Sequence, residues 1–444
     1  MGFFGRKRAP SVPHPRKEPR FDGPLTLERL EQIFQDCVDF TKRPVSLGEG
    51  GACTLTLCYL SGMVKMERVS DYVLRPLAQD EALARCGTPR QAMEEMMGGA
   101  LYNLSAAERT TLDEAAFDLV AGWCLLFFPG ESAVLSLFVG TEEKRSISSP
   151  SNETVLKGSR DAFVESLRTN TSIVRRHLKA PELRIREQVV GRQSVTSVDI
   201  LYIEGLTNPH LVEQVAAQLA DIDIDAVLAT GNIEEYIVPA ARTAFPLVQY
   251  TERSDRFCAG LAEGRVGILI DGLPLGYLAP GVLGDFLQAP QDKSESWLLA
   301  SALTLLRYLC MLGTLLLPAL YVAMVTFHQE MIPTRLALSI IAAKQDVPFR
   351  SVFEVIVLLL AFEILQEAGL RLPQSIGQTV SIIGGLVVGS AAVEAKIISP
   401  AVLIVVAIAG IAGYTMPSQE VAGALRIWRF LLALLASAAG LFGV

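Results

Sequence analysis

The chain has 444 residues, of which 50% are hydrophobic and 19% charged, and its formal net charge is −8 at pH 7. No acidic or basic run is long enough to suggest a nucleic-acid surface, and no zinc-type spacing is present, which argues against a nucleic-acid-binding protein of the usual kinds. At roughly 100–200 residues per domain, the length fits two soluble domains and a membrane region.

The cysteines and the amino terminus indicate the compartment. Seven cysteines, an odd number, form no C-x-x-C pair. This usage is typical of a reduced, cytoplasm-facing protein and not of a disulfide scaffold. Residues 1–24 are basic and rich in proline but lack the apolar core of a signal peptide. We therefore expect a disordered, basic cytoplasmic arm.

Residues 25–140 are predicted to form a first α/β subdomain of a cytoplasmic head. Apolar residues recur at roughly helical spacing over 25–45, which predicts an amphipathic helix there. Residues 52–60 have the character of a buried strand. Two apolar runs, 123–128 and 133–138, flank a Pro-Gly turn and predict a hairpin.

A polar, turn-rich stretch at 141–160 is the best linker candidate, and 161–296 is predicted to form a second α/β subdomain. A helix is expected first, at 161–169. The basic run Arg175–Lys179 is interpreted as a solvated helix face, or else as a contact to anionic lipid or a partner subunit. Further strands and helices then alternate, which implies a largely parallel sheet; they are expected at 197–203, 209–220, 226–229, 233–240 and 267–271.

The head contains no recognisable catalytic constellation. Its Gly-rich stretches 48–51 and 264–267 lack the spacing of phosphate-binding loops. The chain's four histidines form no pair at i,i+4 spacing. Asp221, Asp223 and Asp225 fit an exposed turn better than a cation site, because the glycine and terminal glutamate of an EF-hand are absent. We expect no enzyme, no cofactor and no metal.

Residues 297–444 are predicted to form an α-helical, multi-pass transmembrane module of about four to five membrane segments. Only 15 charged residues lie in this third of the chain. Arg307 interrupts the first apolar run and is expected to reach the membrane interface, or else to lie buried at a pore. Arg426 and Arg429 precede the last run, 430–444, and are also expected at an interface. That run is shorter than a bilayer core, which suggests a further C-terminal piece or a covering partner.

Several polar residues fall inside apolar segments. Only eight residues separate Glu354 from Glu363, far fewer than the ~20 needed to cross a bilayer. The short apolar segments 334–343 and 352–362 are therefore either interfacial helices or the lining of a polar pathway. Gln374 and Gln378, at i,i+4 spacing, are further candidates for a hydrated lumen. A carboxylate at membrane depth is a candidate functional residue because an unpaired charge there is unfavourable.

A ridge of small residues is the most specific physical signal. Gly377, Ser381, Gly385 and Gly389 recur every four residues, and such a ridge lets helix backbones approach closely in lipid. The ridge serves either packing within the chain or contact between subunits. Downstream, Ser399 followed by proline predicts a helix start with a capping hydroxyl.

With these stretches, the chain resembles the A subunit of the spore germinant receptor family. The resemblance is strongest from residue 150 to the end and rests on blocks in both regions. They are Gly158–Asn170, Val198–Gly205 and Gly264–Gly272 in the head, and Leu317–Ala323, His328–Pro333, Phe362–Gly369, Arg371–Pro373, Ile376–Gln378 and Ala391–Glu394 beyond it.

The resemblance implies a subunit of a multi-pass receptor in the inner spore membrane, with its head in the cytoplasm. It implies a membrane B subunit that binds nutrient and a lipoprotein C subunit as partners. It further implies a homo-oligomeric ring that conducts ions, so that nutrient binding releases cations and triggers germination. The alternative is a non-conducting scaffold that couples a nutrient-binding partner to downstream germination proteins. Membrane lipid is a further expected partner. No nucleic-acid partner is expected.

Overall fold

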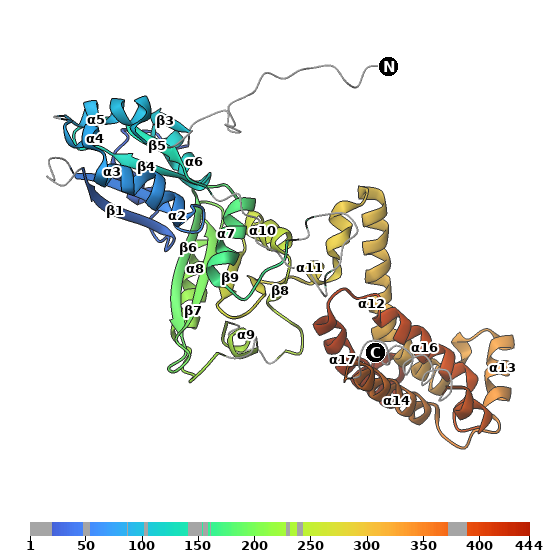
Figure 1. Cartoon of the computed structure of the whole chain (residues 1–444). Helices are drawn as coiled ribbons and strands as arrows, with labels where there is room; N and C mark the ends of the chain where they lie inside the picture. Colours follow the sequence, from blue (N-terminus) through green and yellow to red (C-terminus); the bar gives the residue numbers. More distant parts are fainter. Residues whose placement is uncertain are drawn as a thin grey trace, which may run out of the picture. The chain divides into compact units, whose positions relative to one another are not determined.

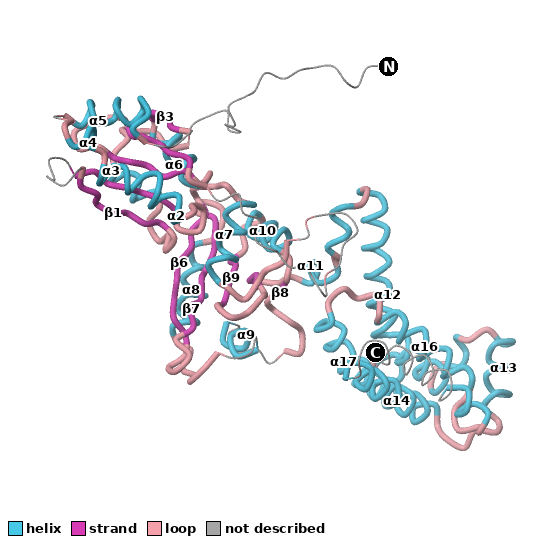
Figure 2. The backbone as a smooth tube through the Cα atoms, viewed as in Figure 1, coloured by secondary structure: helices cyan, strands magenta, loops and turns pink. Residues whose placement is uncertain are grey.

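The protein is described from a computed structural model that covers residues 20–47, 54–86, 88–101, 105–140, 153, 159, 161–227, 231–237, 243–371 and 389–444. Figure 1 shows the chain coloured along the sequence, and Figure 2 shows its helices and strands. Two compact units are present. The first comprises residues 1–154, 159–239 and 250–280, and the second comprises 155–158, 240–249 and 281–444.

The first unit begins with a five-stranded sheet in the order β1-β2-β4-β5-β3. Apolar clusters cover both of its faces, because side chains alternate along each strand. Its strands are β1 Phe40–Ser46, β2 Thr54–Leu60, β3 Ala106–Arg109, β4 Trp123–Phe127 and β5 Val134–Phe138. The surrounding helices are α1 Leu27–Ile33, α2 Met66–Val69, α3 Arg75–Gln79, α4 Glu81–Ala84, α5 Pro89–Glu95 and α6 Leu112–Val120, with π-helical turns η1 Ser70–Leu74 and η2 Met96–Ala100.

Local sequence signals succeed in one part of this sheet and fail in another. The hairpin β4–β5 is confirmed, with Trp123 paired to Phe138 and a left-handed Gly130 in its turn. The predicted helix at 25–45 is wrong beyond Ile33. Residue Asp36 has a φ of 61°, and β1 then pairs antiparallel with β2. Cross-strand pairing overrides the helical spacing of the apolar residues in this segment.

The second sheet of the unit has the order β6-β7-β9-β10-β8. Helices α7 and α10 pack against β7 and β9, and α8 packs against β6 and β7. The strands are β6 Leu183–Val190, β7 Thr196–Ile203, β8 Gln249–Thr251, β9 Val266–Ile270 and β10 Gly276–Ala279. The helices are α7 Leu167–His177, α8 Pro209–Ala220, α9 Gly231–Ile237 and α10 Ser254–Ala262.

The prediction of a largely parallel sheet is wrong, because every pair with a described register is antiparallel. Short turns at Gly191 and Gly272, both at positive φ, join β6 to β7 and β9 to β10, and a short connection permits only antiparallel neighbours. Strand β6 was missed because charged side chains interrupt its apolar ones. The predicted strand at 226–229 is absent from its two described residues.

The two sheets of this unit are joined by backbone and by a buried ion pair. The Val38 amide donates to the Ile185 carbonyl at 3.0 Å, and Cys37 forms a parallel bridge to the same residue. The predicted linker between the sheets, 141–160, lies outside the described residues except for Glu153 and Ser159. The Ser159 carbonyl accepts a hydrogen bond from Arg253, and the Glu153 carboxylate accepts one from Arg256.

The second unit is helical. Helix α12 contacts α14, α16 and α17, and these four share one apolar core. The elements are α11 Leu283–Leu287, α12 Trp297–Thr326, α13 Thr334–Lys344, α14 Ser351–Arg371, α16 Pro400–Gly413 and α17 Gln419–Ala439, with 3₁₀ turns η3 Pro290–Ser294, η4 Gln329–Met331 and η5 Gly440–Phe442. Figure 1 shows α14, α16 and α17 side by side.

Two helices among the described residues are long and apolar enough to cross a membrane: 297–326, and 419–442 with its final turn. Helix α16 is shorter, at 14 residues. Helix α14 has 21 residues but carries four charged side chains, Glu354, Glu363, Glu367 and Arg371. Length and hydropathy therefore directly support two membrane helices among the described residues, fewer than the four to five predicted.

Candidate functional site

The first candidate residue, Glu354, lies in the helical unit and is 1% exposed. Its Oε2 accepts a hydrogen bond of 2.7 Å from the backbone amide of Ser399, the residue before α16. Its Oε1 lies 3.4 Å from the ammonium of Lys344 at the end of α13. The expected capping hydroxyl of Ser399 makes no capping bond. The carboxylate of Glu354 accepts from the amide of Ser399 itself and joins α13, α14 and α16.

The second candidate residue, Glu363, bridges α14 to α17. Its Oε1 accepts from Arg426 at 2.7 Å, and its Oε2 lies 3.8 Å from a terminal nitrogen of Arg429. Arg429 is buried, its guanidinium lies 6.0 Å from the Phe430 ring centre, and its Nε has no hydrogen-bond partner among the described residues. One carboxylate thus faces two guanidinium groups within an apolar helical bundle.

The remaining predicted pathway and packing residues are only partly described. Gln374, Gln378, Gly377, Ser381 and Gly385 lie outside the described residues. Gly389 is buried, and a Cβ added there would lie 3.1 Å from a methyl group of Leu403 on α16. Gly389 therefore packs closely within the chain, as one of the two interpretations of the ridge requires.

Arg307, on α12, is the third charged candidate, and its side chain turns back toward the start of that helix. It forms a two-pronged ion pair with Asp292 on η3, in which Nη2 lies 2.9 Å from Oδ1. It also donates to the Leu287 carbonyl at 3.2 Å. An arginine that extends toward the helix end in this way is typical of an interfacial position.

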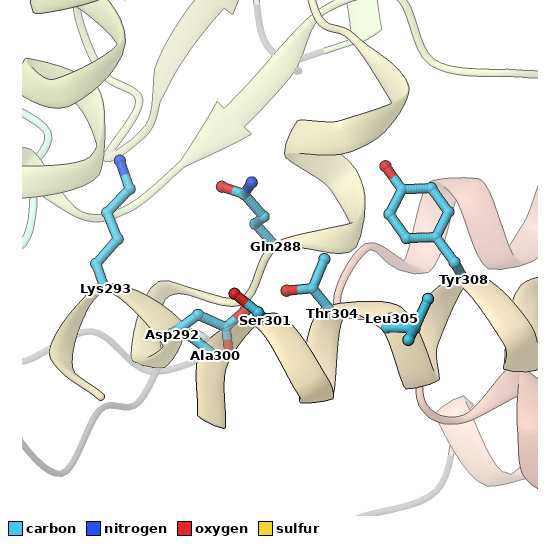
Figure 3. A pocket seen from close by; sticks show the side chains of 8 residues that line it. All are labelled: Gln288, Asp292, Lys293, Ala300, Ser301, Thr304, Leu305 and Tyr308. Atoms are coloured by element: carbon cyan, nitrogen blue, oxygen red, sulfur yellow. The ribbon is translucent and has the colours of Figure 1, made fainter. Parts of the chain in front are cut away.

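Beside this ion pair lies an open pocket of about 480 Å³. Figure 3 shows side chains from η3, from Gln288 directly after α11 and from the first turns of α12 around this pocket. Its lining residues are Gln288, Asp292, Lys293, Ala300, Ser301, Thr304, Leu305 and Tyr308. No pattern in the sequence indicated it, because the Asp292–Arg307 pair beside it joins residues 15 positions apart.

In the first unit, Arg175 corrects the interpretation of the basic run at 175–179 as a solvated face. Its side chain is fully buried, and it donates to both carboxylate oxygens of Asp39 at 2.9 and 3.0 Å. A third donor reaches the Leu183 carbonyl at 2.9 Å. The guanidinium therefore joins the segment before β1 to β6, and thus one sheet to the other.

Asp199 on β7 is a second functional candidate that sequence reasoning missed. It is fully buried, and its Oδ1 has no hydrogen-bond partner among the described residues. Its Oδ2 lies 3.3 Å from Arg168 of α7, which also pairs with Glu187 at 2.6 Å. Burial raises the pKa of Asp199 to about 7; the carboxylates of Glu187, Asp39 and Asp271 act in the same direction, and Arg168 opposes them. The sequence signal that could have identified Asp199 is a single carboxylate within an otherwise largely apolar strand.

One arrangement in this unit has the residue types of a hydrolase triad but not the geometry. The Ser254 hydroxyl lies 3.1 Å from Nε2 of His177, and a carboxylate oxygen of Asp161 lies 3.5 Å from the same nitrogen. In a working triad the carboxylate binds the other imidazole nitrogen, and the serine is accessible. Ser254 is fully buried. Within the described ranges, no group of three candidate side chains could hold a metal ion.

Comparison with known proteins gives a consistent result over nearly the whole chain. The family profile described as Bacillus/Clostridium GerA spore germination protein matches residues 28–444. An uncharacterized membrane protein of Bacillus subtilis (strain 168), YfkQ, is 38% identical over 94% of this chain and 80% of its own length. Spore germination protein KA of the same organism is 36% identical, over 91% and 74% respectively.

Two further proteins show the same similarity. Spore germination protein GerLA of Bacillus cereus is 34% identical over 91% of this chain and 82% of its own length. The crystal structure of the N-terminal domain of the A subunit of the Bacillus megaterium spore germinant receptor GerK3 aligns at 27% identity and a TM-score of 0.45, over 58% of this chain and 94% of that one. None of these relatives is named as an enzyme. The chain belongs to the GerA family of spore germination proteins.

Proposed function

We propose that this protein is the A subunit of a nutrient-gated germinant receptor and forms an oligomeric, multi-pass ion channel in the inner spore membrane. The head lies in the cytoplasm, and a membrane B subunit and a lipoprotein C subunit complete the receptor. Nutrient binding by the complex opens a route for cations, and their release starts germination. The observation that carries this proposal is the charged cluster of Glu363, Arg426 and Arg429 inside the helical bundle.

The position of this cluster along the helices supports a place within the membrane. Arg426 and Arg429 follow the start of α17 by seven and ten residues, which corresponds to roughly 10–15 Å of helix. Glu363 follows the start of α14 by 12 residues, which corresponds to roughly 18 Å of helix. Charged residues at that depth are rare, and they are a mark of ion pathways and gates. On this basis we assign α14 as a membrane segment beside α12 and α17, although it carries charged side chains.

The pairing of the carboxylates also favours a second function. Glu354 and Glu363 both have cationic neighbours, so neither presents an uncompensated negative charge to a passing cation. A subunit that remains in this arrangement would serve as a non-conducting scaffold that couples its partners to later germination proteins. In the channel, by contrast, Glu363 separates from its arginines when the receptor opens.

Cation flux from liposomes distinguishes the two functions. The full chain is reconstituted with its B and C subunits in potassium-loaded vesicles, and efflux is measured before and after nutrient is added. A channel releases potassium. Glu363→Gln leaves two uncompensated arginines and slows efflux by about tenfold, equivalent to ~1.4 kcal/mol at the barrier. Lys396→Gln, in an exposed pair with Asp346, leaves efflux unchanged. Vesicles that stay tight with folded wild-type receptor support the scaffold and contradict the channel.

A further inference from the structure

The pocket beside Arg307 has the chemistry of an anion site at a membrane boundary. Lys293 contributes an ammonium group to its lining, and Gln288 contributes an amide. The nearby carboxylate of Asp292 is neutralised by the two-pronged pair with Arg307 and also accepts from the Ala289 amide at 2.9 Å. That carboxylate therefore does not oppose a negatively charged ligand, because its charge is compensated.

Three side chains with hydroxyl groups also line this pocket. Ser301, Thr304 and Tyr308 lie at i, i+3 and i+7 of α12, which places them on one face of the helix. None of the three makes a side-chain hydrogen bond with a described residue, whereas serine and threonine in helices commonly bond to a preceding carbonyl, as Ser339 and Ser437 do. Figure 3 shows Thr304 and Tyr308 on the same side of the helix as Gln288 and Lys293. Together they form a set of donors suited to phosphate oxygens.

The pocket continues into an apolar surface. Leu305 belongs to its lining, and Leu305, Leu309 and Leu312 form an exposed stripe at i, i+4 and i+7, with exposed fractions of 62%, 59% and 47%. From the pocket to Leu312 the helix rises roughly 17 Å, close to the ~15 Å of one leaflet. Trp297, exposed at the start of α12, is a typical residue of the membrane–water boundary.

We propose that this pocket binds the headgroup of an anionic phospholipid, with the acyl chains lying along the leucine stripe of α12. The phosphate accepts hydrogen bonds from Lys293 and from the hydroxyls of Thr304 and Tyr308. The bound lipid fixes the amino-terminal turns of α12 against η3. The inference rests on the proposed placement of α12 in the membrane, and it adds a lipid requirement to the receptor.

Photolabelling tests this site on the full chain in vesicles. Two phosphatidylglycerol probes are used, one with a diazirine on the headgroup and one at the acyl terminus, together with a headgroup-labelled phosphatidylcholine. The headgroup phosphatidylglycerol probe is expected to label peptides within 288–308, and the acyl probe to label peptides beyond 308. Lys293→Gln reduces headgroup labelling by about tenfold, because a charge-assisted hydrogen bond is lost. Lys396→Gln, an exposed lysine of the same unit, leaves labelling unchanged.

Other results of this labelling experiment would contradict the lipid site or its premise. Equal labelling by both headgroup types, unaffected by Lys293→Gln, would identify ordinary annular lipid and overturn the proposal. Displacement of the phosphatidylglycerol probe by inorganic phosphate would identify a free phosphate site and overturn the assignment to lipid. Flotation of the chain with vesicles is measured in parallel. A chain that does not float contradicts the membrane placement itself, whereas a floating chain without specific labelling contradicts only the lipid site.

Discussion

Replacement of Asp199 by asparagine removes a carboxyl group whose ionised form is unfavourable because the side chain is buried. The carboxyl lies directly across the sheet from Glu187, and both share Arg168 as their cation. Like charges opposite each other on neighbouring strands are destabilising. Asparagine keeps the shape of the side chain, and Arg168 keeps its 2.6 Å pair with Glu187. The substitution therefore tests the charge with little change in packing.

The direction and size of the effect follow from the pKa. Burial raises the pKa of Asp199 from 3.8 to about 7, so the folded state holds the proton more tightly than the unfolded state does. Stability from this group is present below its unfolded pKa and is lost as the pH rises through the folded pKa. The full span of three units corresponds to at most ~4 kcal/mol. The part between pH 5 and 7 corresponds to ~2.7 kcal/mol, or about 100-fold in an opening equilibrium.

Amide hydrogen exchange in peptides of β6 and β7 measures this effect in the full chain in detergent. At pH 5 we expect Asp199→Asn to be only modestly more protected than wild type, because most of the loss of stability occurs above that pH. At pH 8 we expect this difference in protection to be larger than at pH 5, by up to about 100-fold. Asp223→Asn, at an exposed position with a 2.6 Å pair to Arg192, should show no such pH dependence. A variant less protected than wild type by the same factor at both pH values would refute the reasoning, because the carboxylate would then be ionised and stabilised throughout.

Substitutions at three further positions test the other buried contacts. Arg175→Met should destabilise the first unit by about 3–5 kcal/mol in chemical unfolding, because it leaves Asp39 buried without its cation; wild-type stability would contradict the ion pair. Gly389→Leu should lower thermal stability in detergent by about 1–3 kcal/mol through its clash with Leu403, and Gly389→Ala by less; equal stability of all three proteins would contradict close packing at Gly389. Glu363→Gln should destabilise the helical bundle by roughly 3–5 kcal/mol through its two unpaired arginines, and an unchanged melting temperature would contradict the cluster.

Elements defined by neighbouring residues could be predicted from the sequence. The helix at 209–220 has the same bounds in the structure, with Asn208 as its capping residue and Pro209 at its first position. The hairpin around Gly130 was likewise predictable, because a Pro-Gly turn lies between two apolar runs. The start of α16 at Pro400 was predicted for the same kind of local reason.

Contacts between distant residues could not be predicted in this way. Arg175 belongs to a run of basic residues, and its burial depends on Asp39, which lies 136 positions away. The partner of Glu363 is 63 positions away, so the periodicity of α14 alone could not show whether that carboxylate faces water or an arginine. Strand β1 had a helical pattern locally and became a strand because β2 pairs with it. The polar residues were thus identifiable as unusual, but their partners required the fold.

Current through a planar bilayer under a potassium chloride gradient tests the central claim most directly. The account predicts nutrient-dependent currents from the full chain with its B and C subunits, with a reversal potential displaced toward that of potassium. Glu363→Gln should move the reversal potential toward that of chloride, because the cluster then carries only positive charge. The account is contradicted if the correctly folded and assembled receptor passes no current, or if the wild type passes chloride in preference to potassium.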